Sequence, residues 1–175
     1  MEQWISVEYS YFAPSFLPIY FMRVLKKMPL DEAKCAEHAA ALAPTLDLLE
    51  RMNCLDRVCV ASFSDSRLRA ARARFGERVC LSSGPRSVAV LRFGSWRAPV
   101  GVPDVACAQI PLSQYGVPLA TGGFLRHCNR HGIAVHVWTI DEEAEMRRLI
   151  RLGVNGIVTD RPSVLKRVAQ EEGVW

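Results

Sequence analysis

Four residues that could contact a ligand come at or near the ends of short apolar segments: Ser62, Phe63, Gln109 and Trp138. A hydroxyl, an amide and two aromatic rings can orient a small polar molecule, but they do not move a proton or hold a divalent ion tightly. One of Ser62 and Phe63 must point inward, since strand side chains alternate. Gln109 has apolar neighbours, and a buried amide needs hydrogen-bond partners, which favours the interior of a sheet or barrel. Packing in a hydrophobic core is the alternative reading of each residue.

The residues that could do acid–base or metal chemistry are sparse. His127 and His131 are four apart on one expected helix, a spacing that suits a metal pair, but no third ligand is evident and His136 lies on an expected strand. Surface histidines are the favoured interpretation. Asp160 precedes an expected helix, which favours a helix cap over a catalytic acid. The sequence therefore predicts no catalytic residue and no metal ligand.

Charge and composition argue against a nucleic-acid-binding protein and against a disulfide-stabilised secreted protein. The net charge of +4 is too small to imply nucleic acid, although it would suit an anionic small substrate. Five arginines lie between Arg67 and Arg78, and the one aromatic residue among them, Phe75, is at core spacing of the expected helix, so a solvated helix face is favoured over an RNA surface. Six cysteines without a Cys-x-x-Cys pair indicate reduced core thiols rather than a disulfide framework. Residues 1–28 show no export signal and no membrane span, so a cytoplasmic protein is expected.

The elements that must position these residues alternate regularly after residue 41. Short apolar strands and amphipathic helices follow one another, and Gly76, Gly132 and Gly153 end three of the helices. Asp141 is expected to cap one helix, and Asp160 with Pro162 to open the last. The expected strands are Arg57–Phe63, Arg78–Leu81, Ala106–Ile110, Ile133–Thr139 and Gly156–Thr159; the expected helices are Ala41–Asn53, Asp65–Phe75, Pro85–Phe93, Thr121–His131, 141–152 and 162–171.

Strict alternation predicts an α/β fold with a parallel sheet and outer helices. A closed eight-stranded βα barrel needs about 250 residues, so residues 41–175 are expected to form a partial TIM-type barrel whose first half is missing. An open doubly wound sheet is the rival, but the glycine-rich phosphate loop it would normally carry is absent. Cutting a barrel open exposes unpaired strand edges, which predicts instability or self-association.

Three strand ends resemble motifs of the glycerophosphodiester phosphodiesterase family in their amino-acid sequence and in their order along the chain. They are Asp56-Arg-Val-Cys-Val-Ala-Ser-Phe-Ser-Asp65, His131-Gly-Ile-Ala-Val-His-Val-Trp-Thr-Ile140 and Gly153-Val-Asn-Gly-Ile-Val-Thr-Asp-Arg-Pro162. The resemblance covers residues 41–175 and leaves 1–40 as a non-matching segment. It implies a phosphoric diester hydrolase of lipid metabolism that releases an alcohol and glycerol 3-phosphate. It also implies that Trp138 faces the barrel mouth and contacts the glycerol of the substrate.

The resemblance further implies calcium or magnesium, held by carboxylates of the first half of the barrel. The family's His-Arg-Gly and Glu-x-Asp motifs are absent from this sequence: His38 is followed by alanine, and Asp31 and Glu32 are adjacent. Lys34 and Glu37 lie where the family has a lysine and an acidic residue, but without an apolar strand around them. The chain alone is therefore expected to be inactive. A non-catalytic descendant that binds a phosphorylated ligand or a protein, and a truncated fragment without function, are the alternatives.

Overall fold

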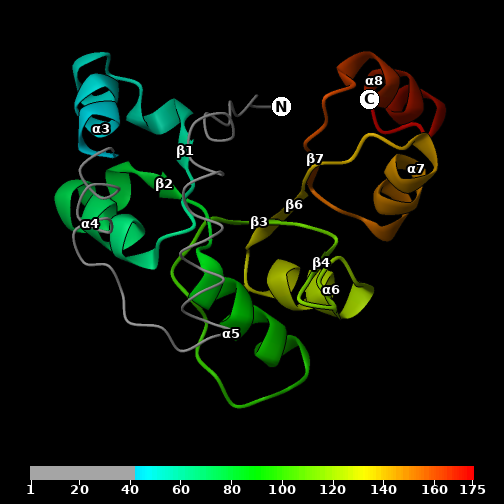
Figure 1. Ribbon diagram of the computed structural model, residues 1–175, viewed down its shortest axis with the longest axis horizontal. Helices are drawn as coiled ribbons and strands as arrows, with labels where there is room; N and C mark the ends of the chain where they lie inside the picture. The colour runs from blue at the N-terminus through cyan, green and yellow to red at the C-terminus, as the bar shows by residue number, and fades with distance from the viewer. Residues whose placement is uncertain (1–41) are drawn as a thin grey trace. The chain divides into compact units, whose positions relative to one another are not determined.

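The computed structural model describes residues 42–175, and the chain divides into two compact units, Met1–Gly84 and Pro85–Trp175 (Figure 1). Each unit is treated separately. The candidates proposed among residues 1–41, which include Asp31, Glu32 and His38, lie outside the described residues.

The described part of the first unit packs two helices against two short parallel strands. Leu46, Leu68, Ala71 and Phe75 are buried together, as their helical spacing predicts. Asn53, at a positive φ of 50°, follows the end of the first helix. The elements are α3 (Leu42–Arg51), a 3₁₀ turn (Leu55–Arg57), β1 (Cys59–Val60), α4 (Asp65–Phe75), a 3₁₀ turn (Gly76–Arg78) and β2 (Cys80–Leu81).

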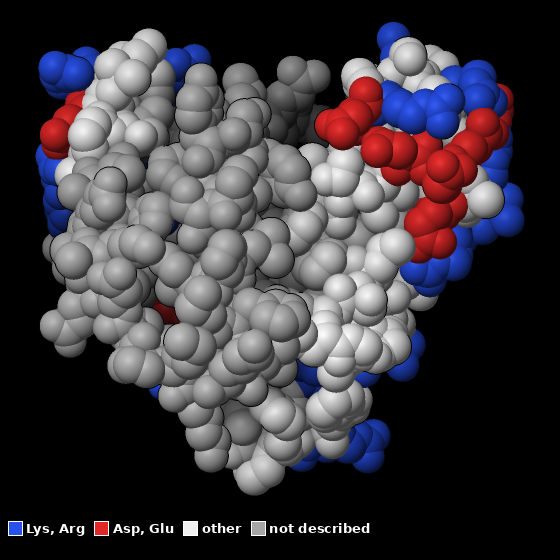
Figure 2. Space-filling view, viewed as in Figure 1, with Lys and Arg blue, Asp and Glu red and all other residues white. Residues whose placement is uncertain are grey.

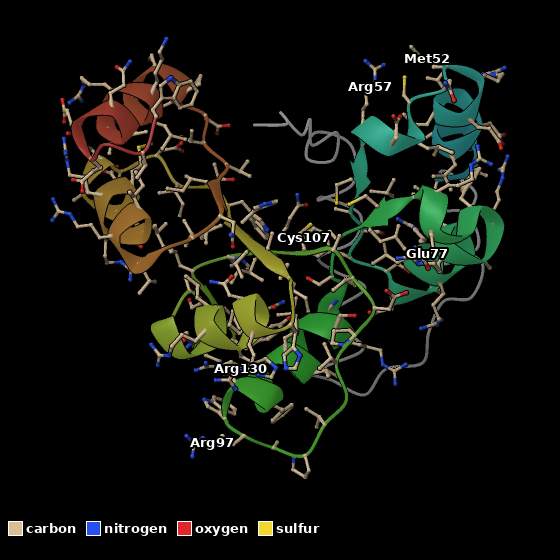
Figure 3. All side chains as sticks on the ribbon, turned by 180° about the vertical axis from the view of Figure 1, so that it is seen from behind. Met52, Arg57, Glu77, Arg97, Cys107 and Arg130 are labelled. Atoms are coloured by element: carbon tan, nitrogen blue, oxygen red, sulfur yellow. The ribbon has the colours of Figure 1, made fainter. Side chains whose placement is uncertain are left out.

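Two expectations for the first unit need correction. Met52 lies within the expected helix Ala41–Asn53, where its spacing from Leu46 and Leu49 predicts burial, but it is 61% exposed because α3 ends at Arg51 (Figure 3). Both strands are shorter than expected, since the backbone before each one winds into a 3₁₀ turn. The arginines of α4 pair with acids of α3: Arg74 lies 2.6 Å from Asp47 and 3.1 Å from Glu50. This pairing fits a solvated structural face.

The second unit is a three-stranded parallel sheet with four helices. The sheet order is β3-β6-β7 (Figure 1). Buried side chains of α5, α6, α7 and α8 share a single core with one face of this sheet. Its elements are α5 (Pro85–Ser95), β3 (Cys107–Ile110), β4 (Ser113–Gln114), β5 (Val117–Pro118), α6 (Gly122–Arg130), β6 (Ala134–Val137), α7 (Glu143–Leu152), β7 (Gly156–Ile157) and α8 (Pro162–Glu171).

The pairing confirms the α/β class with parallel strands. In the first unit β1 and β2 run parallel, with Cys59 opposite Cys80 in the backbone ladder. In the second unit β3 is parallel to β6, and β6 is parallel to β7. The single antiparallel pair in residues 42–175 is the β4–β5 hairpin, which the sequence analysis did not predict. None of the five cysteines in this range forms a disulfide. No helix in the same range is long and apolar enough to cross a membrane.

Asn155 extends the pairing of β7 with β6 beyond the strand itself. Its side-chain Oδ1 accepts a hydrogen bond from the Val135 backbone N–H at 2.8 Å, and its own N–H donates to the Val135 carbonyl at 2.9 Å. Val135 is fully buried. We expect Asn155→Ala to lower the free energy of unfolding by about 1–3 kcal/mol, because a donor in the sheet loses its acceptor. Urea denaturation followed by circular dichroism measures the change.

Asn129→Ala is the matched control, since this exposed asparagine of α6 donates no side-chain hydrogen bond within the described residues. Its effect should stay within about 0.5 kcal/mol. Equal effects of the two substitutions would contradict the assigned role of Asn155.

A network of arginines and glutamates joins α7 to α8. Arg147 contacts Glu143 at 2.8 Å and also pairs with Glu171 and Glu172, while Arg167 contacts Glu143 at 2.6 Å. Figure 2 shows the acidic and basic side chains gathered over these two helices. Hydrogen bonds from Arg167 and Arg147 lower the pKa of Glu143 to about 2.

This network predicts a specific acid sensitivity. Because folding lowers the pKa of Glu143, its stabilisation is complete above its ordinary pKa of 4.5 and is lost as the pH falls toward about 2. Glu143→Gln should therefore lower the melting temperature at pH 7, and its difference from the parent chain should shrink as the pH approaches 2. Glu77→Gln is the control, since Glu77 is 90% exposed and has one ion pair at 3.5 Å. If the difference in melting temperature between Glu143→Gln and the parent chain does not change with pH, the prediction is refuted.

Candidate functional site at the strand ends

The β3-β6-β7 sheet has one apolar face and one partly polar face. Ala108, Ile110, Val135 and Val137 are fully buried in the core shared with the helices. Side chains of a strand alternate between faces, so the residues between these four lie on the opposite face. In a βα barrel the helices pack outside, and the sheet face away from the helices lines the interior.

The opposite face carries a row of three residues in register. Gln109 pairs with His136, and His136 pairs with Gly156. The imidazole of His136 lies against Gly156, where a Cβ would come within 2.9 Å of the ring Cδ2 atom. Both Gln109 and His136 are half-buried. Glycine at position 156 therefore leaves the space that the histidine ring occupies.

Trp138 lies two residues beyond His136, at the carboxyl end of β6. Its backbone N–H donates to the Ile110 carbonyl at 3.0 Å, so the ladder with β3 continues past the strand. The ring is half-buried, and the peptide bond to Thr139 is cis. Alternation puts Trp138 on the same face as His136. The structure thus brings the predicted residues Gln109 and Trp138 onto one face at the strand ends.

Asp141 connects the loop that follows Trp138 to the loop that follows β7. Its Oδ1 atom accepts hydrogen bonds from the Thr159 hydroxyl at 2.8 Å and from the Asp160 N–H at 2.9 Å. Its carbonyl accepts a bond from the Arg161 guanidinium at 3.2 Å. These contacts fix the two loops that flank the tryptophan.

Asp141 and Asp160 were expected to cap the two helices that follow them, and neither does. Glu142 is the N-cap residue of α7, because Asp141 is occupied by the neighbouring loop. Arg161 is the N-cap residue of α8, and its N–H donates to the Thr159 hydroxyl at 3.0 Å. Asp160 is exposed and contributes its backbone N–H to Asp141.

The β4–β5 hairpin follows directly on the carboxyl end of β3, at the same end of the sheet as Trp138. Tyr115 and Gly116 form its turn with positive φ angles of 52° and 76°. Tyr115 is 49% exposed and Leu112 is 37% exposed. The hairpin therefore adds partly apolar surface beside the strand ends.

Ser62 and Phe63 belong to the first unit. Ser62 is buried, and its hydroxyl accepts a hydrogen bond from the Ser64 N–H at 3.2 Å. Phe63 is half-buried. Both lie beyond the carboxyl end of β1, although the expected strand Arg57–Phe63 included them, and their place in a site stays a prediction.

The rings of His127 and His131 meet edge-on with centroids 4.9 Å apart, but the two residues differ in burial. His131 is exposed, whereas His127 is half-buried against Gly94 of α5, where a Cβ would come within 2.5 Å of the imidazole Nε2 atom. Burial, with smaller contributions from His131 and Arg130, lowers the pKa of His127. His127 is thus a packing residue between α5 and α6, which corrects its assignment to the surface.

The described residues do not fit a calcium or magnesium site. Between residues 42 and 175, no three histidine, cysteine or acidic side chains are arranged to hold a metal ion. Calcium takes six to eight oxygen ligands, and magnesium needs an octahedral set. The two loops that flank Trp138 contain three carboxylates: Asp141, already held by two donors, and the exposed side chains of Glu142 and Asp160.

Residues 23–164 match the glycerophosphoryl diester phosphodiesterase family. The curated protein named "Probable glycerophosphodiester phosphodiesterase 2" from Mycobacterium tuberculosis is 34% identical over 145 residues, which cover 78% of this chain and 54% of that protein. The chain belongs to the glycerophosphodiester phosphodiesterase family. The family match begins at residue 23, before the motif-based start at Ala41; residues 1–41 are not described, so the boundary at 40 stays a prediction.

Two solved glycerophosphodiester phosphodiesterases share the fold. The structure from Parabacteroides distasonis superimposes with a TM-score of 0.60 at 20% identity, covering 79% of this chain and 53% of that one. The structure from Agrobacterium tumefaciens gives 0.55 at 19% identity, covering 75% and 51%. The chain spans about half the length of the relatives that it matches.

Proposed function

We propose that residues 41–175 form the C-terminal part of a glycerophosphodiester phosphodiesterase barrel, which orients the substrate but does not cleave it. The observation that carries the proposal is the partly polar sheet face with Gln109, His136 and Trp138 in a chain that belongs to this family. In the complete enzyme, the reaction would release an alcohol and glycerol 3-phosphate.

Each proposed residue has a physical role in holding the substrate. The ring of Trp138 offers an apolar face to the carbon chain of the glycerol, as aromatic side chains do in sugar and polyol sites. Gln109 and His136 can exchange hydrogen bonds with hydroxyl or phosphoryl oxygens. Ser62 and Phe63, at the end of β1, belong to the proposed lining by their family position.

The proposal assigns acid–base chemistry and the divalent ion to residues that this sequence does not contain. The His-Arg-Gly and Glu-x-Asp motifs are absent from all 175 residues. The described residues show no metal-binding cluster. In this proposal the chain is cytoplasmic, and its open sheet edges associate with another copy.

Binding of glycerol 3-phosphate tests the assigned role of Trp138. We expect the full chain to bind this product, and Trp138→Ala to weaken binding by about two- to tenfold, because an aromatic contact is worth about 0.5–1.5 kcal/mol. Isothermal titration calorimetry measures both affinities. Trp175→Ala is the matched control, since that ring is 68% exposed at the end of the chain. Equal losses for the two variants would contradict the role of Trp138.

A further inference from the structure

The end of α5 and the loop to β3 expose four large apolar side chains within ten residues. Phe93 is 52% exposed, Trp96 54%, Val100 40% and Val102 45%. The rings of Phe93 and Trp96 meet edge-on with centroids 5.8 Å apart. The Ala98 N–H donates to the Phe93 carbonyl at 3.1 Å, which turns the loop back against the helix end. Phe93 and Trp96 therefore form a pair of exposed rings, and Val100 and Val102 add exposed apolar side chains on the loop that follows.

The structure holds Trp96 in this exposed position. The guanidinium of Arg92 lies 4.4 Å from the centre of the indole ring. The same guanidinium donates to Ser95 Oγ at 3.2 Å and to Thr121 Oγ1 at 3.3 Å, so it is tied to the start of α6. Because hydrogen bonds to α5 and to the start of α6 fix the Arg92 guanidinium, the indole ring beside it is held in place. A positioned tryptophan with one wet side is typical of membrane–water interfaces.

The surface around these exposed side chains is basic. Residues 85–140 contain five arginines and one acidic residue, Asp104. Arg97 on the loop and Arg126 and Arg130 on α6 are exposed, and α6 packs beside α5 (Figure 3). The other acidic residues of the second unit lie between Asp141 and Glu172, and Figure 2 shows acidic side chains gathered over α7 and α8. The cationic and aromatic groups are thus separated from the acidic ones.

We propose that this surface, made of Phe93, Trp96, Arg97, Val100 and Val102 with Arg126 and Arg130, binds the surface of an anionic lipid bilayer. Exposed aromatic and aliphatic side chains enter the headgroup region, and the arginines meet the lipid phosphates. The loop leads into the amino end of β3, whereas Trp138 lies at the carboxyl ends of the strands. Attachment here leaves the proposed substrate face open. The inference is independent of the proposed enzymatic role.

Vesicle co-sedimentation with the full chain tests the proposal. The vesicles contain phosphatidylcholine, either alone or with one quarter phosphatidylglycerol. We expect binding to the anionic vesicles only, with a marked loss in 0.5 M sodium chloride. Trp96→Ser should weaken partitioning about tenfold, because the indole supplies most of the inserted apolar area. Arg97→Gln and Arg130→Gln should each weaken it about fivefold, the effect of one cation near the lipid surface.

Matched controls lie at the far end of the second unit. Trp175→Ser removes a more exposed tryptophan, at 68%, that also has a cation beside it, Lys166 at 5.9 Å. Arg148→Gln removes an arginine that pairs with Glu145 on α7. Both variants should bind vesicles like the parent chain. Circular dichroism and thermal melting establish that each variant is folded.

Three results would overturn the proposal. The first is equal binding to neutral vesicles, and the second is equal binding of Trp96→Ser and Trp175→Ser. The third is a change of oligomeric state on Trp96→Ser, measured by light scattering without lipid, together with unchanged vesicle binding. That outcome would make the surface a contact between copies of the chain. If Trp96→Ser is unfolded, the vesicle binding of Arg97→Gln and Arg130→Gln tests the proposal instead. Binding of both at the level of Arg148→Gln would contradict it.

Discussion

Phe124→Ala is expected to destabilise the second unit by about 3–5 kcal/mol. Phe124 is fully buried at the start of α6, inside the core shared by β3, β6 and the four helices. Its backbone N–H is also held by the Thr121 hydroxyl, which caps α6. Truncation leaves a cavity that helices on both sides cannot fill without moving. Because small domains are stable by only about 5–15 kcal/mol, much of the population should unfold in mild urea.

Phe93→Ala is the matched control for this prediction. Phe93 is 52% exposed at the end of α5, so the same substitution removes little buried area. Its expected cost is about 0.5 kcal/mol. Urea denaturation of both variants, followed by circular dichroism, measures the difference. If Phe124→Ala costs less than about 1 kcal/mol, α6 does not pack in the core described above.

Apolar pattern was enough to predict the parallel sheet of the second unit. The segment Ala106–Ile110 contains β3, and Ile133–Thr139 contains β6, because buried strands in α/β proteins are continuously apolar. Gly153, at a positive φ of 87°, ends α7 as expected from its αL preference. These features depend on local sequence, which explains why they were predictable.

Features that depend on tertiary contacts were not predictable in the same way. Asp141 has the residue type of a helix cap, but two donors from the β7–α8 loop occupy it instead. His136 joins Gln109 on one face only because the two strands pair in that register, which the sequence does not state. The β4–β5 hairpin depends on Tyr115 at a positive φ, where a non-glycine residue is uncommon.

Two of the predicted lining residues can be located relative to the sheet, while their role in binding stays a prediction. Gln109 and Trp138 were chosen because they end apolar strands, and the structure places both on the face away from the helices. His136 was not predicted as a lining residue, although it is opposite Gln109 in the strand register and two residues before Trp138. Alternation from Trp138 along the same strand was the signal that could have identified it.

Catalytic inactivity of the isolated chain is the prediction with the largest expected effect. Phosphodiester hydrolysis needs charge neutralisation at the phosphoryl oxygens and a proton donor for the leaving alcohol. A positioned acid or base contributes about 10²–10⁴ in rate, and a metal ion adds several kcal/mol of stabilisation. Trp138, Gln109 and Ser62 supply neither. His136 could exchange a proton, but the charge neutralisation would still lack a metal site among residues 42–175. The sequence lacks the motifs that carry these functions in the family, and residues 42–175 contain no metal cluster.

The most direct test is a coupled assay for glycerol 3-phosphate release from glycerophosphocholine by the purified full chain, with calcium and with magnesium. We predict no turnover above buffer with either ion. A complete enzyme of the family serves as the positive control for the assay. Turnover that disappears on chelation would contradict the account, and the metal ligands would then have to be sought among Asp31, Glu32 and Glu37.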